Sequence, residues 1–145
     1  MELIIIRGLP GSGKTTLANR IGNSIESNWT HYEADMYFLD NEGNYKWDRT
    51  KLREAHQWCL TQTREDMHKG YTVIVSNTFT TRRELNPYFD LAREWGITPT
   101  IITCENDWGS VHNIPPETMG AMRLRFERDL TAYMELYRKT LESSL

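Results

Sequence analysis

The chain has 145 residues and a formal net charge of −3, so it lacks the overall positive charge of proteins that coat nucleic acid. A chain of this length is expected to fold as one domain, residues 1–145, without disulfides or structural metal. Cys59 and Cys104 lie far apart with no C-x-x-C spacing, and no apolar run is long enough to span a membrane. We therefore expect a cytoplasmic protein that has no membrane segment and no obligate protein partner.

The first predicted element is a strand over residues 2–7, which is followed by Gly8-Leu9-Pro10-Gly11-Ser12-Gly13-Lys14-Thr15. This sequence fits the phosphate-binding pattern G-x-x-x-x-G-K-[ST], and a predicted helix follows it. The backbone N–H groups of such a loop and the helix dipole form an anion site. The pattern predicts binding of ATP or GTP with Mg²⁺, with Lys14 at the β- and γ-phosphates and the Thr15 hydroxyl on the metal. The expected nucleotide-binding residues are Gly8, Pro10, Gly11, Ser12, Gly13, Lys14, Thr15 and Thr16.

Three more strands are predicted, at residues 30–34, 72–76 and 100–104, and each gap between them holds helical periodicity or a loop. This alternation predicts an α/β fold, and together with the phosphate-binding loop it predicts a P-loop NTPase or kinase fold. Its central parallel sheet would have four or five strands, with helices on both faces and a short lid over residues 105–114. Parallel sheets of this kind bind ligands at the carboxyl ends of their strands. The residues directly after each strand are therefore the candidates for a site.

Hydrophobic periodicity predicts three longer helices. The first covers residues 50–69 and has a buried stripe that includes His56. The second begins near residues 80–81, or at Pro87 if this proline takes the first turn. The last is a single helix that opens at Pro115-Pro116. Its apolar stripe contains Met119, Met122, Phe126, Leu130, Tyr133, Met134, Tyr137 and Leu141.

Asp35, which follows the second strand, is the candidate general base. Transfer of a γ-phosphoryl group to a hydroxyl needs a group that accepts the hydroxyl proton, and in kinases this is typically an Asp. The alternative is that Asp35 caps a helix. The nearby Tyr37 is expected to contact the substrate. The third strand ends in Ser76-Asn77, where many P-loop proteins have an acid. Asn77 is therefore expected to orient the acceptor hydroxyl or a metal-bound water, and Asp35 is the expected carboxylate near the metal.

Several further blocks are shared, in this order, with one known family. They are residues 4–16, Ala34-Asp35-Met36-Tyr37-Phe38, Gly43-Asn44-Tyr45-Lys46-Trp47-Asp48, Ala55-His56, Asn77-Thr78 and Val111-His112-Asn113-Ile114-Pro115 through Met122. Through these blocks the chain resembles the polynucleotide 5′-hydroxyl kinase family of P-loop phosphotransferases, which are AAA-type P-loop kinase domains. The resemblance implies ATP as phosphate donor, Mg²⁺, Asp35 as general base and Thr78 near the acceptor nucleotide.

The chain differs from this family at two places. Family members usually have a lid arginine before the block that begins at Val111, whereas this chain has Trp108-Gly109-Ser110 there. Arg123 is the first choice for a replacement that clamps the transferred phosphate, and Arg125 and Arg82 are the other options. Phe38 stands where a phage member has an arginine that contacts a nucleic-acid phosphate. The aromatic residues from which one or two are expected to stack on bases are Tyr32, Tyr37, Phe38, Tyr45 and Trp47.

These observations lead to one main hypothesis and two alternatives. The main hypothesis is an ATP-dependent kinase that phosphorylates a hydroxyl of a nucleic acid, most simply a polynucleotide 5′-hydroxyl. The first alternative keeps the kinase and changes the acceptor to a hydroxymethylated pyrimidine in DNA, as in DNA-modifying phage enzymes, or to a nucleoside or small metabolite. The second is a regulatory module that binds a nucleotide without catalysis.

Overall fold

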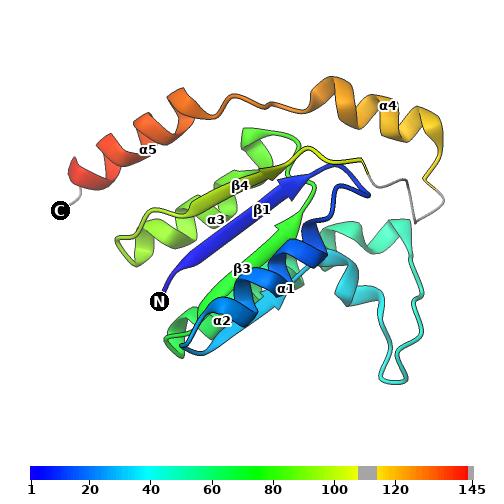
Figure 1. Ribbon diagram of the computed structural model, residues 1–145, viewed down its shortest axis with the longest axis horizontal. Coiled ribbons are helices and arrows are strands. Elements are labelled where there is room, and N and C mark those ends of the chain that lie inside the picture. The colour runs from blue at the N-terminus through cyan, green and yellow to red at the C-terminus, as the bar shows by residue number, and fades with distance from the viewer. Residues whose placement is uncertain (108–113, 144–145) are drawn as a thin grey trace.

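The computed structural model describes residues 1–107 and 114–143. Within these residues, one parallel sheet contains four strands in the order β2-β3-β1-β4 (Figure 1). The strands are β1 (Leu3–Gly8), β2 (Trp29–Tyr32), β3 (Thr72–Asn77) and β4 (Thr100–Cys104). The predicted α/β fold and its parallel sheet are confirmed. The four predicted strands are all present, with small shifts at their ends.

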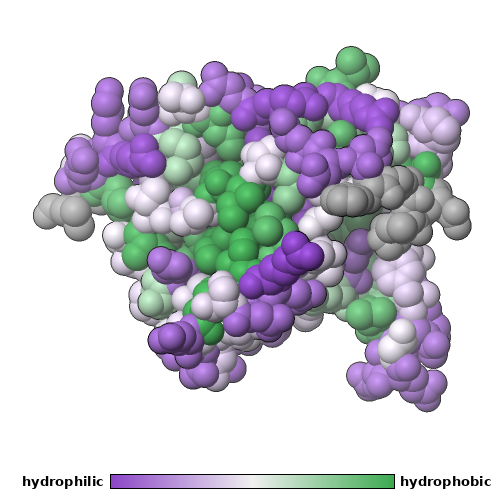
Figure 2. All heavy atoms as spheres, viewed as in Figure 1, coloured by the Kyte–Doolittle hydropathy of each residue, from purple (hydrophilic) through white to green (hydrophobic). Residues whose placement is uncertain are grey.

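The two central strands are buried on both faces, which explains their continuous runs of Ile and Val. Along β1, Leu3 and Ile5 pack toward α2 and α3, while Ile4 and Ile6 pack toward α1 (Lys14–Ser24). Helices therefore cover both faces, as predicted. On the α1 side the cover is partial: apolar atoms remain visible over β1 and β4 between α1 and α5 (Figure 2), and the partly buried Ile102 lies on this face.

Helix α2 (Leu52–His68) follows a 3-10 turn (Arg49–Lys51) and packs against the sheet through one stripe. Its buried side chains are Ala55, Cys59, Thr63, Asp66 and Met67. The predicted helix is confirmed, but the prediction that His56 is buried was wrong, because His56 is exposed. Residues recur on one face at steps of three and four. His56 does lie three residues before the buried Cys59, but it belongs to the first turns of α2, where residues 52–54 and 57 are exposed as well.

Helix α3 (Arg82–Glu94) begins after Thr81, so the first of the two predicted starts is confirmed and the start at Pro87 was wrong. Two contacts of Glu84 hold the first turn. The Thr81 hydroxyl accepts from the Glu84 N–H at 3.4 Å, and a Glu84 carboxylate oxygen accepts from the Thr80 N–H at 2.6 Å. A cap of this kind stabilises the helix start upstream of Pro87. The helix therefore accommodates the proline in its second turn.

The predicted final helix was wrong as a single element, because it is divided into α4 (Pro116–Arg125) and α5 (Thr131–Ser143). Phe126 is extended, with φ −68° and ψ 111°, and its buried ring lies under the Arg7 guanidinium at 4.3 Å. The Glu127 N–H donates to the Thr80 carbonyl at 2.7 Å. These long-range contacts replace the helical bonds that a continuous helix would make here.

The two helices have different surroundings. Helix α5 packs Tyr137 and Leu141 into the main core, whereas α4 has no buried residue and lies near the carboxyl ends of the strands (Figure 1). Of the predicted lid, residues 108–113 lie outside the described part of the chain. Among residues 1–107 and 114–143, no helix combines the length and the apolar character that a membrane crossing requires.

Candidate functional site

The loop after β1 needs glycine for two different reasons. Gly11 and Gly13 have φ angles of 80° and 89°, in the left-handed region that favours glycine. At Gly8 the reason is space, because an added Cβ would lie 2.5 Å from Ser12 Oγ and 2.7 Å from the Cys104 carbonyl oxygen. The loop is therefore folded tightly against the end of β4, and α1 begins directly after it without a side-chain cap on its first turn.

The Lys14 side chain lies over this loop. Its ammonium donates to the Leu9 carbonyl at 3.0 Å. Burial lowers the pKa of Lys14, while the nearby carboxylates of Glu33 and Asp35 act in the opposite direction. The buried Ser12 hydroxyl has no hydrogen-bond partner in the described structure. Pro10 is partly exposed in the loop, and Thr16 is exposed in the first turn of α1. The predicted nucleotide-binding residues therefore form one loop and the first turn of α1, and their contacts with a nucleotide stay a prediction.

Glu33, which the sequence analysis did not select, contacts the predicted metal ligand. The Thr15 hydroxyl donates to Glu33 Oε1, and Ser76 Oγ donates to the same oxygen at 2.9 Å. His31 Nε2 lies 3.4 Å from it. Burial lowers the pKa of His31, although Glu33 opposes this effect. Of the two carboxylates that follow β2, the structure places Glu33, rather than Asp35, against Thr15.

Asp35 lies in a 3-10 turn, η1 (Ala34–Phe38), and its carboxylate is exposed. The residue before this turn is Glu33, so Asp35 is not its N-cap. The Tyr45 hydroxyl donates to Asp35 Oδ1 at 3.5 Å. Burial, followed by the charge of Asp35, raises the pKa of Tyr45. The carboxylate is therefore accessible to an acceptor while remaining close enough to Lys14 to influence its pKa.

Asn77 and Thr78 connect the end of β3 to the rest of the site. The Asn77 amide oxygen accepts from the Ala34 N–H at 2.9 Å and so fixes the turn that carries Asp35. The Thr78 carbonyl accepts from the Gly8 N–H at 3.2 Å. The Asn77 side chain is buried, and the Thr78 side chain is partly exposed. Their predicted contacts with substrate stay predictions, but both residues position neighbouring parts of the site.

The three candidate arginines differ in how strongly they are held. Arg82 Nε lies 2.7 Å from Glu127 Oε2, and Arg125 Nε donates to Thr80 Oγ1 at 3.1 Å. Arg123, on α4, has a longer contact, with Nη2 3.9 Å from Asp107 Oδ2. Its side chain is more than half exposed. Arg123 is therefore the candidate that can be redirected with the smallest loss of existing contacts.

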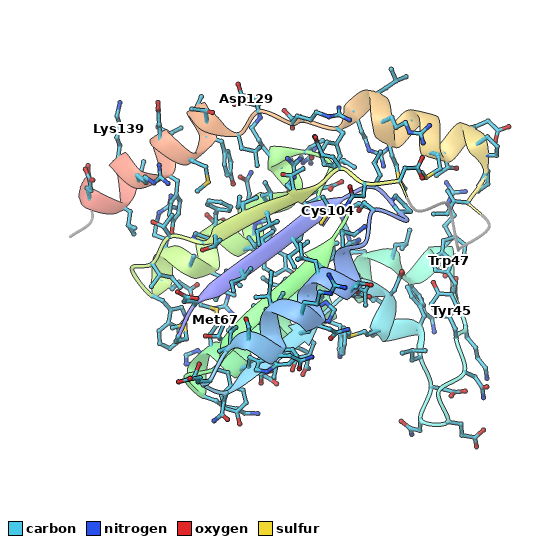
Figure 3. All side chains as sticks on the ribbon, viewed as in Figure 1. Tyr45, Trp47, Met67, Cys104, Asp129 and Lys139 are labelled. Atoms are coloured by element: carbon cyan, nitrogen blue, oxygen red, sulfur yellow. The ribbon has the colours of Figure 1, made fainter. Side chains whose placement is uncertain are left out.

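Residues 39–48 form an arm that projects from the sheet beside η1 (Figures 1 and 3). An antiparallel bridge joins Leu39 to Tyr45. This arm, η1 and the 3-10 turn Arg49–Lys51 line an open groove of about 660 Å³. Tyr37, Trp47, Arg49 and Lys51 are among its lining residues. Trp47 is 53% exposed, so the groove presents an aromatic ring together with three cations, Lys46, Arg49 and Lys51, and two carboxylates, Asp40 and Asp48.

Comparisons with known proteins agree with this architecture. A family model described as an AAA domain matches residues 3–112. Human NEDD4-binding protein 2 is 29% identical in an alignment of 142 positions, and the match covers 88% of this chain and 8% of the human protein. The chain therefore spans a small fraction of that relative.

Two solved structures share the fold at low sequence identity. A chain of the Pnkp1/Rnl/Hen1 RNA repair complex has 18% identity and a TM-score of 0.59, covering 98% of this chain and 44% of that chain. APS kinase from Mycobacterium tuberculosis, in complex with AMPPNP and APS, has 15% identity and a TM-score of 0.56. The match covers 72% of this chain and 62% of that chain. The fold is thus that of P-loop kinases.

Proposed function

The chain belongs to the AAA domain family, and on this premise we propose that it is an ATP- and Mg²⁺-dependent kinase. Its acceptor is a hydroxyl of a nucleic acid, most simply a polynucleotide 5′-hydroxyl. The observation that carries the proposal is the meeting of three features at one end of the sheet. These are the phosphate loop, the exposed carboxylate of Asp35 and the groove beside the arm.

The loop suits a polyphosphate because Lys14 lies over it and the helix that follows starts without a side-chain cap. Magnesium fits the residues next to it, since the Thr15 hydroxyl and the Glu33 carboxylate are oxygen donors in direct contact. In the described part of the chain, no group of three or more His, Cys, Asp and Glu residues could hold a metal. This agrees with an ion held mostly by phosphates and water. When bound, the ion would neutralise charge on the β- and γ-phosphates.

In the proposed reaction, Asp35 accepts the proton of the acceptor hydroxyl while the hydroxyl oxygen attacks the γ-phosphorus. The bond between this phosphorus and the β–γ bridging oxygen breaks, and ADP leaves with the electron pair. Lys14 stabilises the negative charge on the β- and γ-phosphates. Arg123 on α4 supplies the additional positive charge that a lid arginine provides in related kinases.

The groove supports a nucleic-acid acceptor over a small metabolite. Exposed aromatic rings allow bases to stack, and neighbouring cations attract the phosphate backbone. Here Trp47 supplies an exposed ring, and the cations Lys46, Arg49 and Lys51 outnumber the carboxylates Asp40 and Asp48 in the same groove. A nucleoside or a sugar would use only a part of this surface. Because Asp35 lies in the turn next to the arm, a strand bound in the groove can present its terminal hydroxyl to the base.

The proposal is tested with γ-labelled ATP and a panel of acceptors. The panel contains a 5′-hydroxyl oligonucleotide, its 5′-phosphorylated form, hydroxymethyluracil-containing DNA and mixed nucleosides. We expect label to enter only the 5′-hydroxyl oligonucleotide. Label in the modified DNA or in nucleosides would overturn the acceptor assignment and retain the kinase. Tight nucleotide binding without any transfer would instead favour the regulatory module.

A further inference from the structure

Strand β3, which lies beside β1 in the sheet, ends without an acidic residue. β3 pairs with β1 so that Ser76 lies opposite Ile6 and Asn77 opposite Arg7. P-loop NTPases commonly hold Mg²⁺ with an Asp on a strand next to the phosphate loop. Here that place is occupied by a hydroxyl and an amide. If the protein uses Mg²⁺ as proposed, another part of the chain must supply the carboxylate.

Glu33 reaches this place from the adjacent strand. β2 pairs with β3 in parallel, with Tyr32 opposite Val75, and this register brings Glu33 beside Ser76. Ser76 Oγ donates to Glu33 Oε1 at 2.9 Å. His31, on the other side, approaches both residues, with Nε2 2.6 Å from Ser76 Oγ and 3.4 Å from Glu33 Oε1. Ser76, at the end of β3 where an acidic residue is missing, therefore anchors the carboxylate of Glu33, which follows the neighbouring strand β2.

The supporting side chains are buried and the carboxylate is accessible. Ser76 is 2% exposed, and the His31 side chain is 7% exposed, whereas the Glu33 side chain is 21% exposed. The oxygen that Ser76 binds also accepts from the Thr15 hydroxyl. A rigid pair of residues thus holds the carboxylate against the hydroxyl that the phosphate motif assigns to the metal.

We infer that Glu33 is the carboxylate that holds Mg²⁺ at the phosphate loop, together with Thr15. The inference rests on the proposed nucleotide-binding function. Mg²⁺ prefers oxygen ligands and is usually bound through one or two carboxylates plus the phosphates of the substrate. This arrangement divides two tasks between neighbouring carboxylates. Glu33 serves the metal, and Asp35 remains available for the acceptor proton.

The test measures nucleotide binding and not catalysis. The affinity for ADP is determined by calorimetry, in excess Mg²⁺ and in EDTA, for the wild type and for Glu33→Gln. In the wild type, Mg²⁺ should tighten ADP binding. In Glu33→Gln this tightening should fall by about 10- to 100-fold. In EDTA, the affinity of Glu33→Gln for ADP should equal or exceed that of the wild type, because the substitution removes a negative charge near the phosphates.

Three further variants sharpen the comparison. Asp35→Asn should keep the full effect of Mg²⁺, because its carboxylate does not contact Thr15. Glu33→Asp should keep part of the effect, because it retains the charge on a shorter side chain. Glu26→Gln is the matched control, since Glu26 is exposed beyond the far end of α1. Thermal melting of each variant shows whether it is folded.

The outcomes separate the inference from the proposed function. An equal effect of Mg²⁺ in the wild type and in folded Glu33→Gln would overturn the role of Glu33 and leave the kinase proposal intact. Loss of the effect in Asp35→Asn with retention in Glu33→Gln would also overturn it, in favour of Asp35. Equal affinity of the wild type for ADP with and without Mg²⁺ would also overturn the role of Glu33. A wild type that binds no nucleotide in either condition would contradict the proposed function itself.

Discussion

Glu127 binds Arg82 through both carboxylate oxygens. Oε1 accepts from the backbone N–H of Arg82 at 2.8 Å, and Oε2 accepts from its Nε at 2.7 Å. The contact joins the segment between α4 and α5 to the first residue of α3. Because Glu127 lies two residues after the end of α4, this ion pair fixes the base of the helix that carries Arg123.

The first prediction concerns the pH dependence of this contact. Hydrogen bonds from Arg82 hold the pKa of Glu127 below its ordinary value of 4.5. The charged carboxylate therefore stabilises the fold above that value, and this contribution is lost as the pH falls through the lowered pKa. Glu127→Gln should lower the melting temperature at neutral pH, and the difference from the wild type should disappear in strong acid. Glu135→Gln, which is exposed on α5, should show no such difference at either pH.

The second prediction separates the candidate arginines. Arg123→Ala should lower turnover by at least about 100-fold, in keeping with the contribution of charge-stabilising arginines in phosphoryl transfer. It should leave the melting temperature nearly unchanged, because the ion pair that Arg123 makes within residues 1–107 and 114–143, to Asp107, is a long one. Arg82→Ala should lower the melting temperature through loss of the Glu127 contact. Mild effects on turnover at Arg123, Arg125 and Arg82 alike would favour a regulatory module or a clamp supplied by another chain.

The third prediction tests the packing of the phosphate loop. Gly8→Ala places a methyl group 2.7 Å from the Cys104 carbonyl oxygen, which belongs to the backbone and cannot rotate away. The loop must shift, so nucleotide affinity should fall while the sheet remains folded. Gly120→Ala is the matched control, because a Cβ there has no heavy atom within 4 Å. In the α4 helix this change should stabilise by up to about 1 kcal/mol. Nucleotide affinity of Gly8→Ala equal to that of the wild type would show that the loop tolerates this shift.

The fourth prediction concerns the acceptor groove. Trp47→Ala should raise the KM for a 5′-hydroxyl oligonucleotide by about 5- to 150-fold, the range expected for loss of one stacked base. The KM for ATP should not change, because Trp47 lies on the arm and not at the phosphate loop. Leu136→Ala removes an exposed apolar side chain from α5 and serves as the control. An unchanged oligonucleotide KM in Trp47→Ala would move the acceptor out of this groove.

Local sequence patterns were sufficient to predict most of the fold. The strands and the phosphate loop are identified by short-range features, namely apolar runs and a fixed spacing of glycines. The division between α4 and α5 was missed because the apolar periodicity continues through Phe126 and Leu130. What ends α4 is a set of distant partners, Arg7 and Thr80, that no local pattern contains. One local signal was present, since Asp129 Oδ1 accepts from the Thr131 N–H at 3.0 Å at the start of α5.

The candidate site was predictable to the level of the sheet edge and no further. The rule that ligands bind at the carboxyl ends of parallel strands identified Asp35 and Asn77 as neighbours of the loop, and it did not select Glu33. The sequence alone does not show which carboxylate turns toward Thr15, because that depends on how β2 pairs with β3 and on the 3-10 turn after it. The anchoring of Glu33 by Ser76 and His31 became visible only with this pairing.

The central claim is that Asp35 accepts the proton during phosphoryl transfer from ATP to a nucleic-acid hydroxyl. The most direct measurement is the rate of label transfer from γ-labelled ATP to a 5′-hydroxyl oligonucleotide by the wild type and by Asp35→Asn, at saturating nucleotide. We predict measurable transfer by the wild type and a rate lower by about 10²- to 10⁴-fold in the variant, with unchanged affinity for ATP. Equal rates in the two proteins, or no transfer by the wild type to any hydroxyl acceptor, would contradict the account.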